Sequence, residues 1–162
     1  MYKVVFDADG LIKLAKSGLL DTATKSLKCI ISKEVYKEVV EKGKEKLYED
    51  AYTVEAFVHS GEIEAVVTKQ VREEGSLSAG ELSAVELYKA KKADIIVSDD
   101  RRFLHLLQKE NIPFVIPTDL MVVLTKIGKV TKEEAINGLN KIRDLVREDA
   151  YLAALQSLGG EK

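Results

Sequence analysis

The chain has 162 residues, of which 46% are hydrophobic, and a formal net charge of −2. This length fits one domain with a substantial apolar core, and the charge excludes a protein that coats nucleic acid by overall electrostatic attraction. The one cysteine, Cys29, lies in an apolar run and excludes a disulfide framework; no run approaches the roughly 20 apolar residues of a membrane span. The opening run of residues 1–6 is too short for a signal peptide, so we expect a cytoplasmic protein.

Short apolar runs, bounded by polar or turn residues, predict strands along the chain. In chain order these strands are residues 2–6, 29–31, 63–68, 93–97 and 113–116. Apolar residues at helical spacing predict the elements between and after them. These helices are residues 11–17, 19–27, 33–42, 44–60, 78–91, 101–110, 118–127, 132–147 and 149–158.

Capping residues and glycines set several helix limits. Ser32 can cap the helix at 33–42, and Gly43 is expected to end it. Leu47 is expected on the apolar stripe of the next helix, 44–60. The polar segment 69–75 is expected to be an exposed connection.

The alternation of strands and helices indicates the fold class. It predicts an α/β protein, a three-layer α/β/α sandwich with a central, mostly parallel sheet covered on both faces. No repeat, linker or low-complexity stretch interrupts this order. We therefore expect a single domain over 1–162, with a core of about 3–130 and a C-terminal helical extension at 131–158.

Acidic residues follow two of the predicted strands. Asp7 and Asp9 come after the strand at 2–6, and Asp99 and Asp100 come after the strand at 93–97. In a parallel sheet, ligands bind outside the carboxyl ends of the strands. If these two strands are neighbours, their carboxylates meet at one edge, where a hard divalent cation would neutralise them.

Two helical glutamates could complete this cluster. Glu38 lies in the second turn after Ser32, and Glu81 lies in the first turn of the helix at 78–91. Each acid also has a structural interpretation: Glu81 suits a capping box with Ser78, and Glu38 suits an ion pair with Lys42. Residues 7–10 equally suit a strand-to-helix turn, and residues 99–100 suit a helix cap. These alternatives do not explain why all the acids converge on one edge.

The acids lie in four motifs: residues 4–12 (VVFDADGLI), 31–40 (ISKEVYKEVV), 78–87 (SAGELSAVEL) and 95–103 (IIVSDDRRF). In this order the motifs resemble those of the PIN-domain family of metal-dependent ribonucleases, which includes VapC-like toxins. Each motif is short, but four in the right order and spacing over about residues 3–130 are a fairly specific signal. The third acid of the family is often Asp, whereas Glu81 stands here.

The resemblance implies a site, a cofactor and a reaction. It implies one or two Mg²⁺ or Mn²⁺ ions and hydrolysis of RNA, in which the metal activates water and stabilises the developing charge. The catalytic residues would be Asp7, Glu38, Glu81, Asp99 and Asp100. Asp7, Glu81, Asp99 and Asp100 would ligate metal; either Asp99 or Asp100 fits the last motif. Asp9 and Ser98 would play secondary roles, and Lys13, Arg101 and Arg102 would contact phosphate.

Other functions fit parts of the sequence. Residues 5–10 also resemble the Asp-x-Asp motif of haloacid-dehalogenase-type phosphatases, with Asp7 as nucleophile, but that reading leaves Glu38 and Glu81 without a role. A PIN-like module that binds without catalysis is a further alternative, although it would be expected to lose some acids. The resemblance also allows a toxin paired with an antitoxin protein. The amphipathic helices at 44–60 and 131–158 suggest a homodimer.

Overall fold

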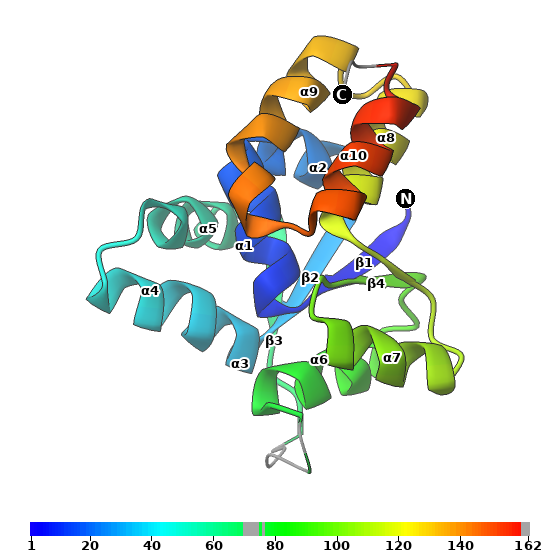
Figure 1. The fold of residues 1–162 in the computed structure, drawn as a ribbon. Coiled ribbons are helices and arrows are strands. Elements are labelled where there is room, and N and C mark those ends of the chain that lie inside the picture. The colour runs from blue at the N-terminus through cyan, green and yellow to red at the C-terminus, as the bar shows by residue number, and fades with distance from the viewer. Residues whose placement is uncertain (70–74, 76, 160–162) are drawn as a thin grey trace.

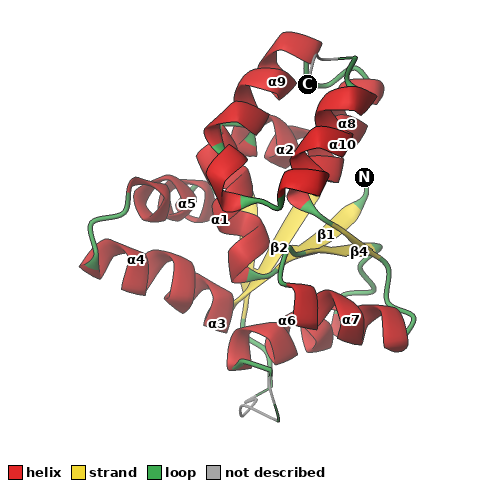
Figure 2. Cartoon of the chain, in the orientation of Figure 1, coloured by secondary structure: helices red, strands yellow, loops and turns green. Residues whose placement is uncertain are grey.

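The computed structural model describes residues 1–69, 75 and 77–159. In this part of the chain, parallel strands form one five-stranded sheet in the order β3-β2-β1-β4-β5. Figures 1 and 2 show strands β1, β2 and β4 between the helices. The strands are β1 (Lys3–Phe6), β2 (Lys28–Ser32), β3 (Ile63–Val66), β4 (Ile95–Val97) and β5 (Phe114–Val115). Each coincides with a predicted strand; β2 is longer than predicted, and the other four are shorter.

Helices connect the strands and follow the last one. Before β4 these are α1 (Ala8–Ser17), α2 (Leu20–Ser26), α3 (Lys33–Tyr36), the π-helical turn η1 (Lys37–Glu41), α4 (Lys42–Glu45), α5 (Glu49–His59) and α6 (Ala79–Ala90). After β4 they are α7 (Arg101–Lys109), α8 (Pro117–Lys126), α9 (Lys132–Lys141), the 3₁₀ turn η2 (Arg143–Leu145) and α10 (Glu148–Ser157).

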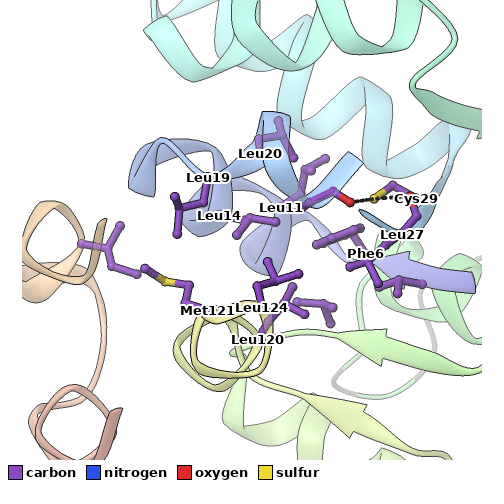
Figure 3. Close-up of a cluster of buried hydrophobic side chains, with 14 of the residues drawn as sticks. Phe6, Leu11, Leu14, Leu19, Leu20, Leu27, Cys29, Leu120, Met121 and Leu124 are labelled. Carbon is purple, nitrogen blue, oxygen red and sulfur yellow. Dashed lines mark hydrogen bonds between the residues drawn. The ribbon is translucent and has the colours of Figure 1, made fainter. Parts of the chain in front are cut away.

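Helices cover both faces of the sheet, because side chains along each strand alternate between two apolar layers. Phe6 and Ile31 belong to the larger layer, with residues of α1, α2, α5, α8, α9 and α10. Figure 3 shows part of this layer, to which Phe6 and, from α1, Leu11 and Leu14 belong. Val5 and Ile96 belong to the second layer, with α6 and α7. The predicted three-layer α/β/α fold is confirmed.

The central strand β1 sets the position of the acidic edge. It pairs in parallel with β2 on one side and with β4 on the other. Phe6 lies opposite Val97 in this register, and the backbone N–H of Asp7 donates to the carbonyl of Val97 at 3.2 Å. Because the two strands end side by side, the residues that follow them are neighbours. The prediction that the carboxylates meet at one edge required these two strands to be neighbours, and they are.

The segment around Gly43 differs from the prediction. The helix does not end there but continues through η1 and α4 to Glu45. A Cβ on Gly43 would lie 2.7 Å from the Cβ of Ala51, so the glycine allows α4 to pack closely on α5. The predicted helix at 44–60 is broken at Leu47, which has φ of 58° and is 79% exposed. Leu47 therefore belongs to a surface turn and not to an apolar stripe.

The last two helices pack into the larger apolar layer. The helix predicted at 132–147 ends at Lys141, and Ile142 is fully buried directly after it. The chain then turns through η2, and Tyr151 and Leu155 of α10 join the same layer as α8 and α9. Most of the connection predicted at 69–75 lies outside the described residues. Within those residues, none of the helices is long and apolar enough to cross a membrane.

Candidate functional site

Asp7 is the most firmly held carboxylate at the edge of the sheet. It follows β1 and is only 2% exposed. Its Oδ1 accepts a 2.7 Å hydrogen bond from the backbone N–H of Gly10, which caps α1. Its Oδ2 accepts a 2.5 Å hydrogen bond from the hydroxyl of Ser98, which follows β4. Both carboxylate oxygens are therefore oriented by neighbouring elements.

Gly10 permits the close contact between α1 and the end of β4. A Cβ at this position would lie 2.6 Å from the carbonyl oxygen of Val97 and 3.1 Å from Oδ1 of Asp7. Any larger residue would separate the helix from the strand. The glycine in the first motif is thus explained by packing around Asp7.

Burial strongly disfavours the charged form of Asp7. It raises the pKa of this carboxyl from 3.8 to about 7, and the negative charges of Asp9 and Glu81 act in the same direction. The hydrogen bonds from Ser98 and Gly10 lower the pKa but do not compensate for burial. A cation nearby would favour the charged form and so offset the effect of burial on Asp7.

Glu81 holds one oxygen in a helix cap and leaves the other without a partner. Its Oε1 accepts a 3.0 Å hydrogen bond from the backbone N–H of Ser78, whose hydroxyl in turn accepts from the N–H of Glu81 at 3.1 Å. This is the capping box predicted from the sequence. Oε2 of Glu81 is buried and has no hydrogen-bond partner among the described residues. The cap therefore accounts for Oε1 of Glu81 but not for the burial of Oε2.

Glu38 reaches the same place from the π-helical turn η1, where it lies on the surface. π-Helical turns are rare and frequently occur at functional sites. A Cβ on Gly80 would lie 3.1 Å from Oε2 of Glu38, so the glycine leaves room for this carboxylate beside α6. Loss of hydration raises the pKa of Glu38; Lys42 lowers it, whereas the charges of Glu81 and Asp9 raise it.

A buried contact between two serines fixes α3 against α6. The hydroxyls of Ser32 and Ser83 lie 2.7 Å apart, and both residues are fully buried. Ser32 also caps α3 by accepting from the N–H of Val35. This contact sets the position of Glu38 relative to Glu81, because each glutamate is carried by one of the joined helical segments.

Asp99 and Asp100 take different positions after β4. Oδ1 of Asp100 caps α7 by accepting from the N–H groups of Arg102 and Phe103 at 3.0 and 3.1 Å. Oδ2 of Asp99 accepts a 2.6 Å hydrogen bond from Nζ of Lys13. Asp99 lines a cavity of about 230 Å³ together with Arg101, Asp119 and Arg147.

A separate cavity of about 220 Å³ collects most of the predicted acids, and we call it the acidic cavity. It is lined by Asp7, Ala8, Asp9, Glu38, Ser78, Glu81, Asp100 and Arg102. Of the predicted catalytic residues, Asp99 alone is missing from this lining. Asp9, to which the sequence assigned a secondary role, lines it directly. Of the three predicted phosphate contacts, only Arg102 does so, since Arg101 lies at the neighbouring cavity and Lys13 is paired with carboxylates.

The acidic cavity offers ligands that suit a hard divalent cation. All its acidic side chains present carboxylate oxygens, and Oε2 of Glu81 is a buried acceptor for which the described residues supply no donor. In residues 1–69, 75 and 77–159, no three Asp, Glu, His or Cys side chains already lie close enough together to hold a metal ion. The carboxylates line the walls of the cavity, so coordination would require their side chains to turn inward.

Four residues that contribute to this region were not identified as such from the sequence. Gly80 precedes Glu81 and could have been noticed as the residue that gives Glu38 room. Ser83 is one turn further along α6, and its contact with Ser32 has no local signal. Arg147 and Asp119 approach Asp99 only because α8 and α10 fold back over the edge of the sheet.

Comparison with known families identifies the group to which this fold and site belong. Residues 3–159 match a family model described as a PIN domain, and the chain therefore belongs to the PIN-domain family. No curated protein matches the sequence significantly. The resemblance seen in the four motifs is confirmed, whereas the VapC-like subtype stays a prediction. PIN domains are generally nucleases, which supports a hydrolase of the nuclease class over a phosphatase.

Proposed function

We propose that this protein is a ribonuclease that requires Mg²⁺ or Mn²⁺ and hydrolyses phosphodiester bonds at the acidic cavity. The observation that carries the proposal is Oε2 of Glu81, which is buried and has no hydrogen-bond partner in the described part of the chain; beside it, burial raises the pKa of Asp7. Burying such groups without a partner is unfavourable, and a divalent cation would remove the cost for both. Membership of a nuclease family agrees with this interpretation.

The residues of the cavity have distinct proposed roles. Asp7, Glu38, Glu81 and Asp100 would hold the cation, which when bound supplies positive charge to the scissile phosphate and lowers the pKa of a coordinated water. Ser98 orients the carboxylate of Asp7 by donating a hydrogen bond to Oδ2. Arg102 lines the cavity and would contact a phosphate oxygen.

The direct test compares substrates and metals with the wild-type protein. Single-stranded RNA and p-nitrophenyl phosphate are each incubated with EDTA, Mg²⁺, Mn²⁺ or Ca²⁺. The proposal predicts RNA cleavage with Mg²⁺ or Mn²⁺, none with EDTA, and no release of p-nitrophenol. Phosphate-ester hydrolysis without RNA cleavage would instead establish the phosphatase. RNA cleavage that persists in EDTA would overturn the metal requirement.

A further inference from the structure

Lys13 lies inside the acidic cluster and is not a free basic residue on its rim. Its Nζ is 3.1 Å from Oδ2 of Asp9 and 2.6 Å from Oδ2 of Asp99. The Lys13 side chain is only 13% exposed, and that of Asp99 only 11%. Both contacts are ion pairs, so the ammonium of Lys13 brings a positive charge into the cluster. One ammonium thus bridges the acidic segments that follow β1 and β4.

This bridge divides the carboxylates into two sets. Asp9 and Asp99 already have a cation between them. Asp7, Glu81 and Asp100 are held by hydrogen bonds from backbone N–H groups or from a hydroxyl. Glu81 retains a buried oxygen that has no partner in the described part of the chain. Glu38 completes the second set from the other wall of the cavity. Only this second set lacks an internal positive charge within hydrogen-bond distance in the described residues.

We propose that Lys13 is a built-in cation that takes the place of a second metal, so that the acidic cavity binds one divalent ion and not two. This inference rests on the proposed function, which requires the cavity to bind metal. In two-metal sites the ions are about 3.5–4 Å apart and share neighbouring carboxylates. Asp9 and Asp99 are the carboxylates available for a second ion, and Lys13 occupies the space between their oxygens. A second dication would have to displace this ammonium and would then lie beside its charge.

Lys13 thereby also has a positioning role. It ties Asp99 to α1, and Asp99 consequently lines the neighbouring cavity with Arg147 and not the acidic cavity. Lys13 also forms an ion pair with Asp9, which lines the acidic cavity.

The test counts bound Mn²⁺ from the electron paramagnetic resonance signal of the free ion during a titration. Wild type should bind one Mn²⁺ per chain. Lys13→Met removes the charge but keeps most of the stem, and it should bind a second Mn²⁺ more weakly. Lys13→Arg should bind one, and adding Asp99→Asn to Lys13→Met should return the count to one. Lys25→Met is the matched control, because Lys25 pairs with Asp21 at the same i,i+4 spacing on the exposed surface.

Two outcomes would overturn the inference while leaving the proposed function intact. These are two ions bound to wild type, or a count of one in both wild type and Lys13→Met. Absence of Mn²⁺ binding by wild type would overturn the proposed function and the inference together. Circular dichroism of each variant checks that it is folded, and Lys13→Gln provides a second neutral variant if Lys13→Met does not fold.

Discussion

The hydroxyl of Ser98 donates a 2.5 Å hydrogen bond to Oδ2 of Asp7, joining the end of β4 to the end of β1. Ser98 also accepts a 3.2 Å hydrogen bond from the backbone N–H of Asp100. One buried side chain therefore orients the central carboxylate and positions the loop that carries the last acid. This relationship makes Ser98 part of the electrostatics of the site and not only of its packing.

Replacing Ser98 with Ala should raise the pKa of Asp7 further. Its hydrogen bond stabilises the charged carboxylate, and the loss of such a bond corresponds to about one pKa unit or more. The measurement is a carbon-13 NMR titration of the Asp7 carboxyl in metal-free protein. Wild type should titrate near 7 and Ser98→Ala at higher pH. Titration of Asp7 near its ordinary value of 3.8 in both proteins would contradict the account.

Asp7 should make the metal-free protein less stable as the pH rises. Because the folded-state pKa is raised from 3.8 to about 7, the folded state binds the extra proton more tightly than the unfolded state. This contribution to stability is fully present below about pH 4 and is lost as the pH rises through about 7. Asp7→Asn has no carboxyl at this position and should not lose stability in this way. In EDTA, the free energy of unfolding of Asp7→Asn minus that of wild type should therefore be about 2–4 kcal/mol larger at pH 8 than at pH 4.

Urea unfolding at both pH values measures this difference. Asp21→Asn is the control, since Asp21 is an exposed residue paired with Lys25 on α2. The control should follow the wild-type pH dependence. A parallel pH dependence of Asp7→Asn and wild type would show that burial of Asp7 does not determine it.

Gly80 should matter for activity more than for stability. A methyl group at Gly80 would press on Oε2 of Glu38, 3.1 Å away, and turn this carboxylate out of the cavity. Alanine is favoured over glycine in a helix by about 0.5–1 kcal/mol, which offsets part of the crowding. Gly80→Ala should therefore lower the rate of RNA cleavage by roughly tenfold or more, which corresponds to a rise of about 1.4 kcal/mol in the activation free energy. The midpoint of urea unfolding should change little.

A double-mutant cycle tests whether Gly80→Ala lowers cleavage by displacing Glu38. If Gly80→Ala acts through Glu38, it should reduce cleavage little further in a Glu38→Gln background. Equal reductions in both backgrounds would show that Gly80 acts independently of Glu38.

Asp99 and Asp100 should differ in their effect on metal binding. Asp100 lines the acidic cavity, whereas Asp99 is bonded to Lys13 and lines the neighbouring one. Asp100→Asn retains the cap of α7, because Asn is also a good N-cap residue, but removes a ligand charge. It should weaken Mn²⁺ binding by about tenfold, corresponding to roughly 1.4 kcal/mol, and Asp99→Asn should weaken it less. Calorimetric titration measures both affinities, and a larger loss for Asp99→Asn would reverse the assignment.

The sequence predicted the fold well because the strands and helices have clear local patterns. The buried strand ahead of Asp7 and the capping box of Glu81 can both be identified from a few adjacent residues. The continuation of the helix past Gly43 could not be identified in this way. It depends on Ala51 of the next helix, which packs closely on Gly43 because the glycine has no side chain. The turn at Leu47 follows from the same packing, which brings α4 and α5 together.

The site could be predicted where residues directly follow a strand or lie near the start of a helix, because these positions lie at the carboxyl edge of a parallel sheet. The positions of Asp7, Glu38 and Glu81 around one cavity agree with that expectation. The choice between Asp99 and Asp100 was not predictable, because two adjacent residues after a strand point in different directions. The contact between Lys13 and Asp9 could be seen as an i,i+4 pair, but the decisive contact with Asp99 exists only because β1 and β4 are neighbours.

Single-turnover cleavage of RNA by Asp7→Asn, compared with Asp21→Asn, is the most direct test of the central claim that the acidic cavity performs metal-dependent hydrolysis. The substitution keeps the size of Asp7 but removes the charge that would hold the cation. With saturating Mn²⁺, the account predicts that Asp7→Asn loses at least about a hundredfold in rate, roughly 2.7 kcal/mol, while Asp21→Asn equals wild type. Unchanged cleavage by a folded Asp7→Asn protein would contradict it and place the chemistry elsewhere on the molecule.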